Sequence, residues 1–192
     1  MTDPVIDIDR PLRADARRNR ERILQSARVV FAKYGADAQI DDVAREAGVG
    51  VGTVYRHFPN KEALLAELIR EKFRLFAARA RESLAQDGEP FAVLVELMRH
   101  NAQTAAGDAA VQHALLGVGE QIWLQASAEQ DDLLAATEQL LARARDAGTI
   151  RPDIGALDIG MLMCGVCSTL GEKPGFDWRR HLDLVIDMLR AP

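Results

Sequence analysis

The chain has 192 residues, of which 48% are hydrophobic, 28% charged and only 5% aromatic. This many apolar residues can bury a core, which excludes a chain that is disordered throughout. The scarcity of aromatic residues and the abundance of Leu, Ala, Arg and Glu favour packed helices over a sandwich of short strands.

The net charge of −5 is distributed unevenly along the chain. Residues 10–61 carry 11 Lys and Arg against 6 Asp and Glu, which gives this part a charge of +5. Residues 84–192 carry 8 against 16, which gives −8. Clustered positive charge favours a polyanionic partner such as nucleic acid. Arginine-rich helices also occur as solvated surfaces, so charge alone leaves both interpretations open.

No segment indicates export or membrane insertion. The first nine residues contain three aspartates and no apolar run, which is unlike a signal peptide. The longest uncharged stretch near the other end, residues 159–171, is too short to span a bilayer as a helix. Two cysteines are too few for a secreted disulfide framework, so we expect a cytoplasmic protein.

The first helical pattern begins at about Asp15, where apolar residues recur at helical spacing until Gly35. Two shorter helices are predicted at residues 40–47 and 51–58. Gly48 follows the first of them and allows the chain to turn sharply. Two short helices separated by three or four residues are typical of a helix-turn-helix.

Six further helices are predicted after this motif. Asn60 is placed to cap the first, Pro90 suits the opening turn of the second, and Asp108 and Ser127 are candidate caps for the next two. Their ranges are residues 60–84, 90–106, 108–117, 127–147, 156–170 and 177–189. We therefore predict an all-α chain of about nine helices. It divides into a disordered lead-in at 1–9, a three-helix helix-turn-helix domain at 10–60 and a helical bundle at 61–192.

The most informative segment runs from Arg20 to Leu65 and reads RERILQSARVVFAKYGADAQIDDVAREAGVGVGTVYRHFPNKEALL. It resembles the tetracycline-repressor (TetR) family over the whole DNA-binding unit, through IDDVAREAGV, GTVYRHF and NKEALL in that order. The resemblance implies a sequence-specific regulator, most often a repressor that leaves a palindromic operator when a small-molecule effector binds. Gln39 and Gly50 depart from the family pattern, because Ser or Thr hydroxyls are common there, so capping or phosphate contacts are expected to differ in detail.

The third predicted helix carries side chains suited to DNA. Arg56 can engage guanine bidentately and is the best candidate for reading a base, while Lys61 can meet a phosphate. Tyr55 either contacts phosphate or packs against the first helix. The arginines at positions 10, 13, 17, 18 and 20 form a basic arm that can reach the DNA backbone or an adjacent minor groove, with solvated charge as the alternative. The predicted DNA-contacting residues are Arg18, Gln39, Gly50, Val51, Gly52, Thr53, Tyr55, Arg56, His57 and Lys61.

Beyond about residue 84 the resemblance is one of architecture alone. It implies an effector pocket in the bundle and a homodimer formed through the last two helices, residues 156–170 and 177–189. The candidate pocket residues are Met98, Asn101, Trp123, Met161 and Trp178, with ordinary core packing as the alternative.

Cys164 and Cys167 form a C-G-V-C pattern. No second cysteine pair completes a zinc site, and the surroundings are apolar, so both thiols are expected to be buried and inert. A thiol-redox or metal-responsive sensor remains an alternative, as does a helical interaction module that no longer reads DNA. No nucleophile with a base, phosphate loop or carboxylate pair is evident, so we expect neither an enzyme nor a cofactor or metal.

Overall fold

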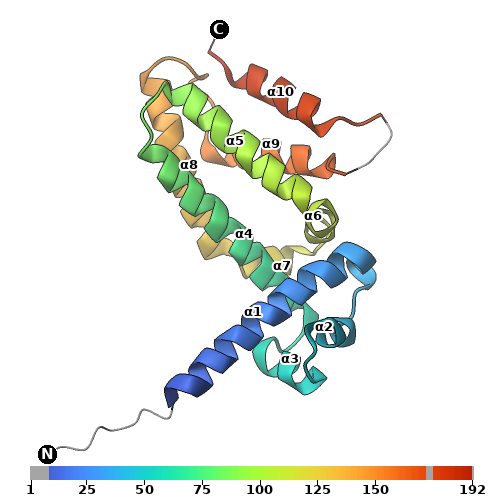
Figure 1. The fold of residues 1–192 in the computed structure, drawn as a ribbon. Coiled ribbons are helices and arrows are strands. Elements are labelled where there is room, and N and C mark those ends of the chain that lie inside the picture. The colour runs from blue at the N-terminus through green and yellow to red at the C-terminus, as the bar shows by residue number, and fades with distance from the viewer. Residues whose placement is uncertain (1–8, 172–174, 192) are drawn as a thin grey trace, which may run out of the picture. The chain divides into compact units, whose positions relative to one another are not determined.

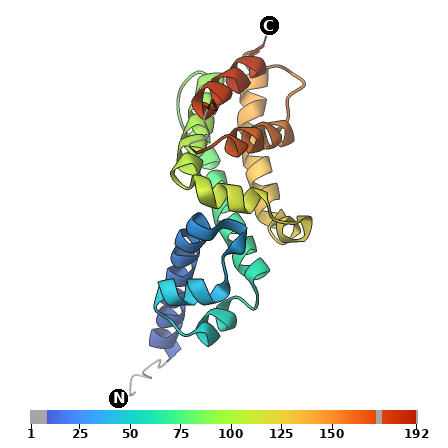
Figure 2. The same ribbon diagram turned by 90° about the vertical axis from the view of Figure 1, so that its right-hand side faces the viewer.

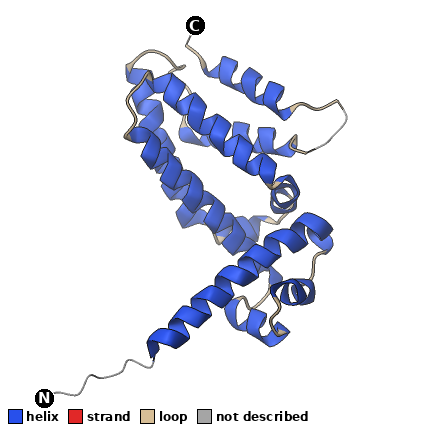
Figure 3. Ribbon diagram, viewed as in Figure 1, coloured by secondary structure: helices blue, strands red, loops and turns tan. Residues whose placement is uncertain are grey.

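The computed structural model describes residues 9–171 and 175–191, so the expected lead-in, apart from its last residue, lies outside the described residues. All regular elements of this described part are helices, apart from an isolated antiparallel bridge between Ile150 and Arg190 (Figure 3). The predicted all-α class is confirmed. The chain divides into two compact units, one up to Leu64 and one from Leu65 onward.

The first unit contains α1 (Asp9–Tyr34), a short 3-10 helix η1 (Gly35–Asp37), α2 (Ile40–Ala47) and α3 (Val51–His57) (Figure 1). The predicted start of the first helix near Asp15 is wrong, because α1 already begins at Asp9 and includes Arg10 and Arg13. Its early turns lack an apolar stripe that periodicity can detect, yet Arg, Leu and Ala have high helix propensity.

A small apolar core holds the first unit together. The buried face of α1 consists of Ile23, Leu24, Ala27, Val30 and Phe31, all of which are at most 3% exposed. α2 packs against both α1 and α3. Val43 of α2 and Val54 of α3 are fully buried, and this fixes the orientation of the two short helices within the unit.

The other helices of the described chain are α4 (Lys61–Leu84), α5 (Pro90–Gly107), α6 (Ala109–Leu116), α7 (Glu120–Leu124), α8 (Ser127–Asp146), α9 (Ala156–Ser168) and α10 (Trp178–Leu189). In the second unit α9 contacts α5, α6, α8 and α10 (Figure 2), which explains why its sequence is apolar nearly all round. Leu94, Leu141 and Val166 are fully buried in the core of this unit.

The described residues form ten α-helices, one more than the approximate number predicted. The additional helix is α7, whose five residues include Trp123 but are too few to produce a periodic stripe. The capping box predicted at Ser127 is also wrong. Ala126 is the N-cap residue and its N–H donates to Trp123 O, so α8 follows α7 without room for an extended serine cap.

The remaining predicted caps divide into one success and one failure. The Asn60 side chain accepts a hydrogen bond from the Ala63 N–H at 2.8 Å, as predicted for the start of α4. Asp108 precedes α6 but makes no side-chain cap. α5 has a cap that the sequence interpretation missed, because the Glu89 carboxylate accepts from the N–H groups of Phe91 and Ala92.

Candidate nucleic-acid interface and ligand cavity

The turn between α2 and α3 determines how α3 is presented. Gly48 adopts a left-handed conformation, with φ +62° and ψ 36°, and its N–H donates to the carbonyls of Ala44 and Arg45. The Val49 N–H also donates to Ala44 O, at 3.1 Å. A side chain at position 48 would be strained in this conformation, which explains why glycine ends α2.

α3 has one buried side and one exposed side. Val54 anchors the helix in the core, whereas Val51 is 37% and Tyr55 47% exposed. Gly52 and Arg56 are exposed as well. Residues four apart lie on the same face of a helix, so these four exposed positions form one continuous surface.

Arg56 lies along this surface and is held by its own helix. Its Nη2 donates to Thr53 Oγ1 at 2.9 Å, and its Nε donates to Gly52 O at 3.3 Å. A guanidinium has five N–H donors, so these two bonds leave donors for a further acceptor. The bonds restrict the rotamers of Arg56 before any partner arrives.

Nothing bulky surrounds the start of α3. Gly50 is the N-cap residue, and the Thr53 N–H donates to its carbonyl at 2.8 Å. A Cβ at Gly50 or Gly52 would meet no atom within 4 Å. Position 50 thus has no side-chain hydroxyl, and its exposed backbone can be approached closely by a partner molecule.

The aromatic residues of α3 have different environments. Tyr55 is nearly half exposed, which leaves its hydroxyl accessible and is compatible with packing of part of its ring against α1. His57 is partly buried, with its ring centroid 6.4 Å from that of Phe58. Phe58 itself is buried, and the Arg20 guanidinium lies 5.4 Å from its ring centroid.

The other predicted contact residues of the first unit lie on α1, before α2 and at the start of α4. Arg18 is exposed and forms an ion pair with Asp15. The Gln39 side chain donates from Nε2 to Asp37 O at 2.8 Å, so it supports the loop that precedes α2. The Lys61 ammonium lies 5.8 Å from the ring centroid of Phe31.

The second unit contains a cavity of about 460 Å³ formed by α4, α5, α7, α8 and α9. Four of the five predicted pocket residues line it, namely Met98, Asn101, Trp123 and Met161. Trp178 does not. It lines a separate pocket with Phe176 and packs against core residues, which was the alternative for this group.

Both thiols also line the cavity, although only one of them is buried. Cys167 is 5% exposed, and burial raises the pKa of its thiol. Cys164 is exposed, so the prediction that both cysteines are buried is wrong for this residue. Met161, one turn earlier on α9, lines the same cavity and is 59% exposed.

Sequence interpretation missed the one charged residue of the described cavity wall, Lys72 of α4. The predicted stripe of inward residues in this helix consisted of apolar side chains alone. Lys72 directly precedes Phe73, an inward-facing aromatic residue. This neighbourhood could have identified Lys72, because a long side chain next to such a residue can reach the cavity.

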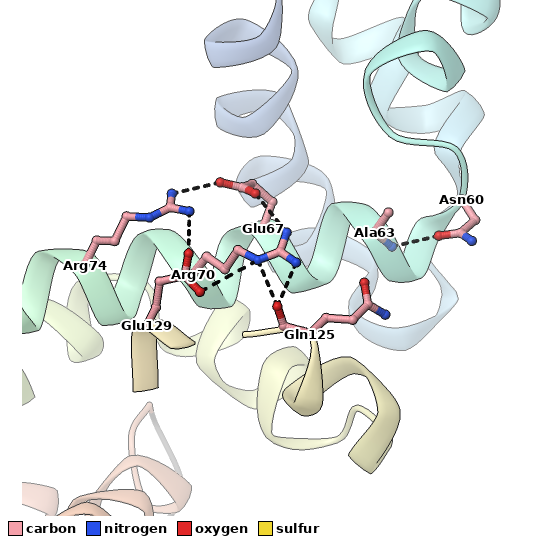
Figure 4. A network of polar contacts seen from close by, with 7 residues as sticks. All are labelled: Asn60, Ala63, Glu67, Arg70, Arg74, Gln125 and Glu129. Atoms are coloured by element: carbon pink, nitrogen blue, oxygen red, sulfur yellow. Dashed lines mark hydrogen bonds and ion pairs between the residues drawn. The ribbon is translucent and has the colours of Figure 1, made fainter. Parts of the chain in front are cut away.

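A polar network connects α4 to the segment around the start of α8 (Figure 4). The Glu67 carboxylate, in a residue only 5% exposed, accepts from Arg70 Nη1 at 3.1 Å and from Arg74 Nη1 at 2.9 Å. Arg70 also donates to Gln125 O at 3.0 and 2.7 Å, and Arg74 donates to Glu129 at 2.8 Å. The hydrogen bond to Glu67 raises the pKa of Arg74.

Two short helices joined by a glycine turn, with the second helix exposing an arginine, a tyrosine and bare backbone, define a helix-turn-helix DNA-binding protein. Residues 23–68 match the family model for bacterial regulatory proteins of the tetR family. Residues 89–191 match the model for the C-terminal domain of SbtR-like transcriptional regulators.

Individual relatives agree with these matches. The regulator UidR of Escherichia coli is 30% identical over 74% of this chain and 74% of its own. A TetR regulatory protein from Mycobacterium vanbaalenii is 38% identical, covers 94% of this chain and 100% of its own, and superposes with a TM-score of 0.64. SmeT in complex with triclosan is 25% identical, covers 88% of both chains and has a TM-score of 0.68. The chain belongs to the TetR family of transcriptional regulators.

Members of this family bind DNA, form dimers and respond to small molecules. No described helix is long and apolar enough to cross a membrane. Within residues 9–171 and 175–191, no group of three or more His, Cys, Asp or Glu side chains is placed to hold a metal ion.

Proposed function

We propose that the chain is a homodimeric repressor that holds a palindromic operator through α3 and releases it when a small molecule fills the cavity of the second unit. The observation that carries this proposal is the exposed surface of α3, on which Arg56 is held by hydrogen bonds to Gly52 and Thr53. Because its proposed target is DNA, the protein is proposed to act in the cytoplasm.

The residues of the first unit have three roles in this proposal. Arg56 reads a base edge in the major groove, where Val51 and Gly52 allow close approach. Phosphates are held by the hydroxyls of Thr53 and Tyr55, by His57, by the amide of Gly50 and by the cations of Arg18 and Lys61. Gln39 acts indirectly, because it secures the loop before α2.

The homodimer is proposed to form through α9 and α10. These helices contact one another, and each exposes large apolar side chains. Met161 of α9 is 59% exposed, and Leu184 and Met188 of α10 are 46% and 56% exposed. Four helices, two from each subunit, can bury these side chains, and a two-fold axis matches a palindromic site.

The cavity supports a ligand-responsive function. Its volume lies in the range of small-molecule sites, roughly 300–1,000 Å³, and its wall is mostly apolar with a few polar groups. SmeT, a neighbour of similar fold, is known in complex with triclosan. An effector acts by preferring the conformation that does not bind the operator.

Selection of bound duplexes from a random DNA pool at near-physiological salt tests the proposal. We expect enrichment of a palindrome by the natural chain and none by the Arg56→Ala, Lys61→Ala double variant. The matched control is Arg99→Ala, Arg151→Ala, which also removes two cations but from the second unit. No enrichment by the natural chain would favour an interaction module that no longer reads DNA.

A thiol-responsive regulator is the second candidate, because Cys164 and Cys167 both line the cavity. Oxidation by hydrogen peroxide would then release a selected operator, and Cys164→Ser would prevent this release. If small molecules release the operator, and the Cys164→Ser variant responds to them as the natural chain does, the ligand-responsive proposal is favoured.

A further inference from the structure

The cavity wall has an unusual charge composition. Of its described lining residues, Lys72 alone is charged, and no Asp or Glu is among them. The second unit as a whole is acidic, with 19 Asp and Glu against 13 Lys and Arg over residues 65–192. The cavity is thus a locally positive site within an acidic unit, and it disfavours a cationic ligand.

Lys72 has no charged partner among the described residues. Its ammonium donates to Gln112 Oε1 of α6 at 2.5 Å and lies 5.7 Å from the ring centroid of Phe76. Lys72 is half-buried, and a neutral amide and an aromatic face compensate only part of the cost of removing its ammonium partly from water. A carboxylate in the cavity would satisfy Lys72 better than Gln112 does, because charge-assisted hydrogen bonds are the stronger ones.

The rest of the wall suits an apolar body. It is formed by aromatic, aliphatic and thioether side chains, including Phe73, Leu97, Met98 and Trp123. The rings of Phe73 and Trp123 lie 6.0 Å apart. The few uncharged polar groups are already engaged in part, since Thr137 Oγ1 donates to Leu133 O at 2.9 Å.

We propose that the effector is an apolar organic acid that carries a single negative charge, bound with its carboxylate on Lys72. This inference rests on the proposed ligand-responsive function. One lysine matches one negative charge, whereas a phosphate dianion would leave charge uncompensated in an apolar cavity. The carboxylate replaces Gln112 as the acceptor for Lys72, so binding exchanges a link between α4 and α6 for a link between α4 and the ligand.

Calorimetric titration of the full chain with a matched series of compounds tests the inference. The probes are decanoate, decanamide, decylamine and decyl phosphate, together with naphthaleneacetate and its amide as a flat aromatic pair. At least one acid is expected to bind about tenfold or more tightly than its amide, and more tightly than the amine or the phosphate. Equal affinity of acids and amides would overturn the inference.

Variants at two positions, Lys72 and Gln112, test where the negative charge of the ligand is bound. Lys72→Met is expected to abolish the preference for the acid and leave amide binding unchanged, while Lys72→Arg retains the preference. Gln112→Glu supplies an internal carboxylate of the same size, so it should weaken acid binding about tenfold without affecting the amide. Arg99→Met is the control, because Arg99 pairs with Asp183 outside the cavity wall. Unchanged acid affinity in Lys72→Met or Gln112→Glu would contradict the inference.

The same titrations distinguish this inference from the function on which it rests. If an amide binds as tightly as its acid and also releases the selected operator, the ligand-responsive function stands and the acid preference is wrong. If none of the six compounds binds, the cavity is not the site of an apolar acid and the ligand-responsive proposal loses its support from this cavity as well.

Discussion

The Arg56 guanidinium donates from Nη2 to Thr53 Oγ1 across one turn of α3, at 2.9 Å. Both side chains belong to the helix that presents the proposed DNA-reading surface. The threonine hydroxyl therefore has two roles to serve, because it orients the arginine and also lies where a phosphate contact is proposed. An arginine that is already oriented loses less conformational entropy when it engages a guanine.

Replacement of Arg56 should change specificity as well as affinity. We expect Arg56→Ala to lose about 1–3 kcal/mol of discrimination at one base pair of each half-site, since the bidentate contact is removed. Thr53→Val keeps the shape of residue 53 and should cause a smaller loss of discrimination at the same base pair, together with a uniform loss from its phosphate contact. Binding assays with single-base variants of the selected operator measure both. A loss that is uniform over all sequences would identify Arg56 as a phosphate contact.

Replacement of Lys61 should lower the affinity for all DNA sequences alike, in contrast to the base-specific loss expected for Arg56→Ala. A phosphate contact carries no sequence information, so Lys61→Ala should weaken specific and non-specific DNA to a similar degree. The slope of log affinity against log salt concentration should become shallower by about 0.9, the value for one phosphate contact on duplex DNA. Arg99→Ala, which removes a cation from the second unit, should leave the slope unchanged. A sequence-dependent loss would argue against a phosphate role for Lys61.

Two glycines of the helix-turn-helix should respond differently to alanine. Gly48 has φ +62°, so Gly48→Ala should lower the free energy of unfolding by about 1–2 kcal/mol. Gly52 lies inside α3, and a Cβ there meets nothing within 4 Å, so Gly52→Ala should raise stability by roughly 0.5–1 kcal/mol. Urea denaturation measures both. Equal effects would show that backbone conformation does not distinguish these sites.

The proposed dimer surface can be tested by placing charge on it. Leu184→Arg, Met188→Arg should yield monomers, because two arginines on each subunit cannot be buried against their copies. Leu75→Arg is a suitable control, since Leu75 of α4 is 43% exposed and lies on neither α9 nor α10. Sedimentation velocity gives the oligomeric state. A dimer that persists in the double variant would place the interface elsewhere.

The two thiols should differ in reactivity and in pH dependence. Cys164 is exposed and should react rapidly with iodoacetamide in the native protein. Burial raises the pKa of Cys167, so this thiol stays protonated at neutral pH and its labelling should increase only as the pH rises through the elevated pKa. Mass spectrometry of Cys164→Ser and Cys167→Ser separates the two rates. Faster labelling of Cys167 at neutral pH would contradict this assignment.

Periodicity and turn residues were sufficient for most of the secondary structure. The Gly48 turn and the Asn60 cap were predictable because they depend on local backbone chemistry. The start of α1 was not predictable, because charged residues with high helix propensity extended the helix beyond its apolar stripe. The serine cap failed at Ser127, because α7 and α8 follow one another so closely that the cap position lies at Ala126.

The cavity was less predictable than the fold. Met98 and Trp123, which were selected as large flexible or aromatic residues, line the cavity, whereas Trp178, selected by the same criterion, packs elsewhere. A cavity depends on which helix faces meet, and these contacts join residues that are far apart in sequence. Lys72 illustrates this limit, since only packing reveals that its ammonium meets Gln112 of another helix.

The buried Glu67 carboxylate has a mechanical consequence. Two arginines hold it, and the same arginines hold Gln125 and Glu129, so no single bond of this group can be released without weakening the others (Figure 4). We therefore expect the middle of α4 and the start of α8 to move together when either is displaced. Gln130 and Trp123, which are close in sequence to Glu129 and Gln125 of this network, also line the cavity. A ligand that displaces Gln130 or Trp123 would therefore also displace α4, because the ion pairs and hydrogen bonds of this network join the two segments.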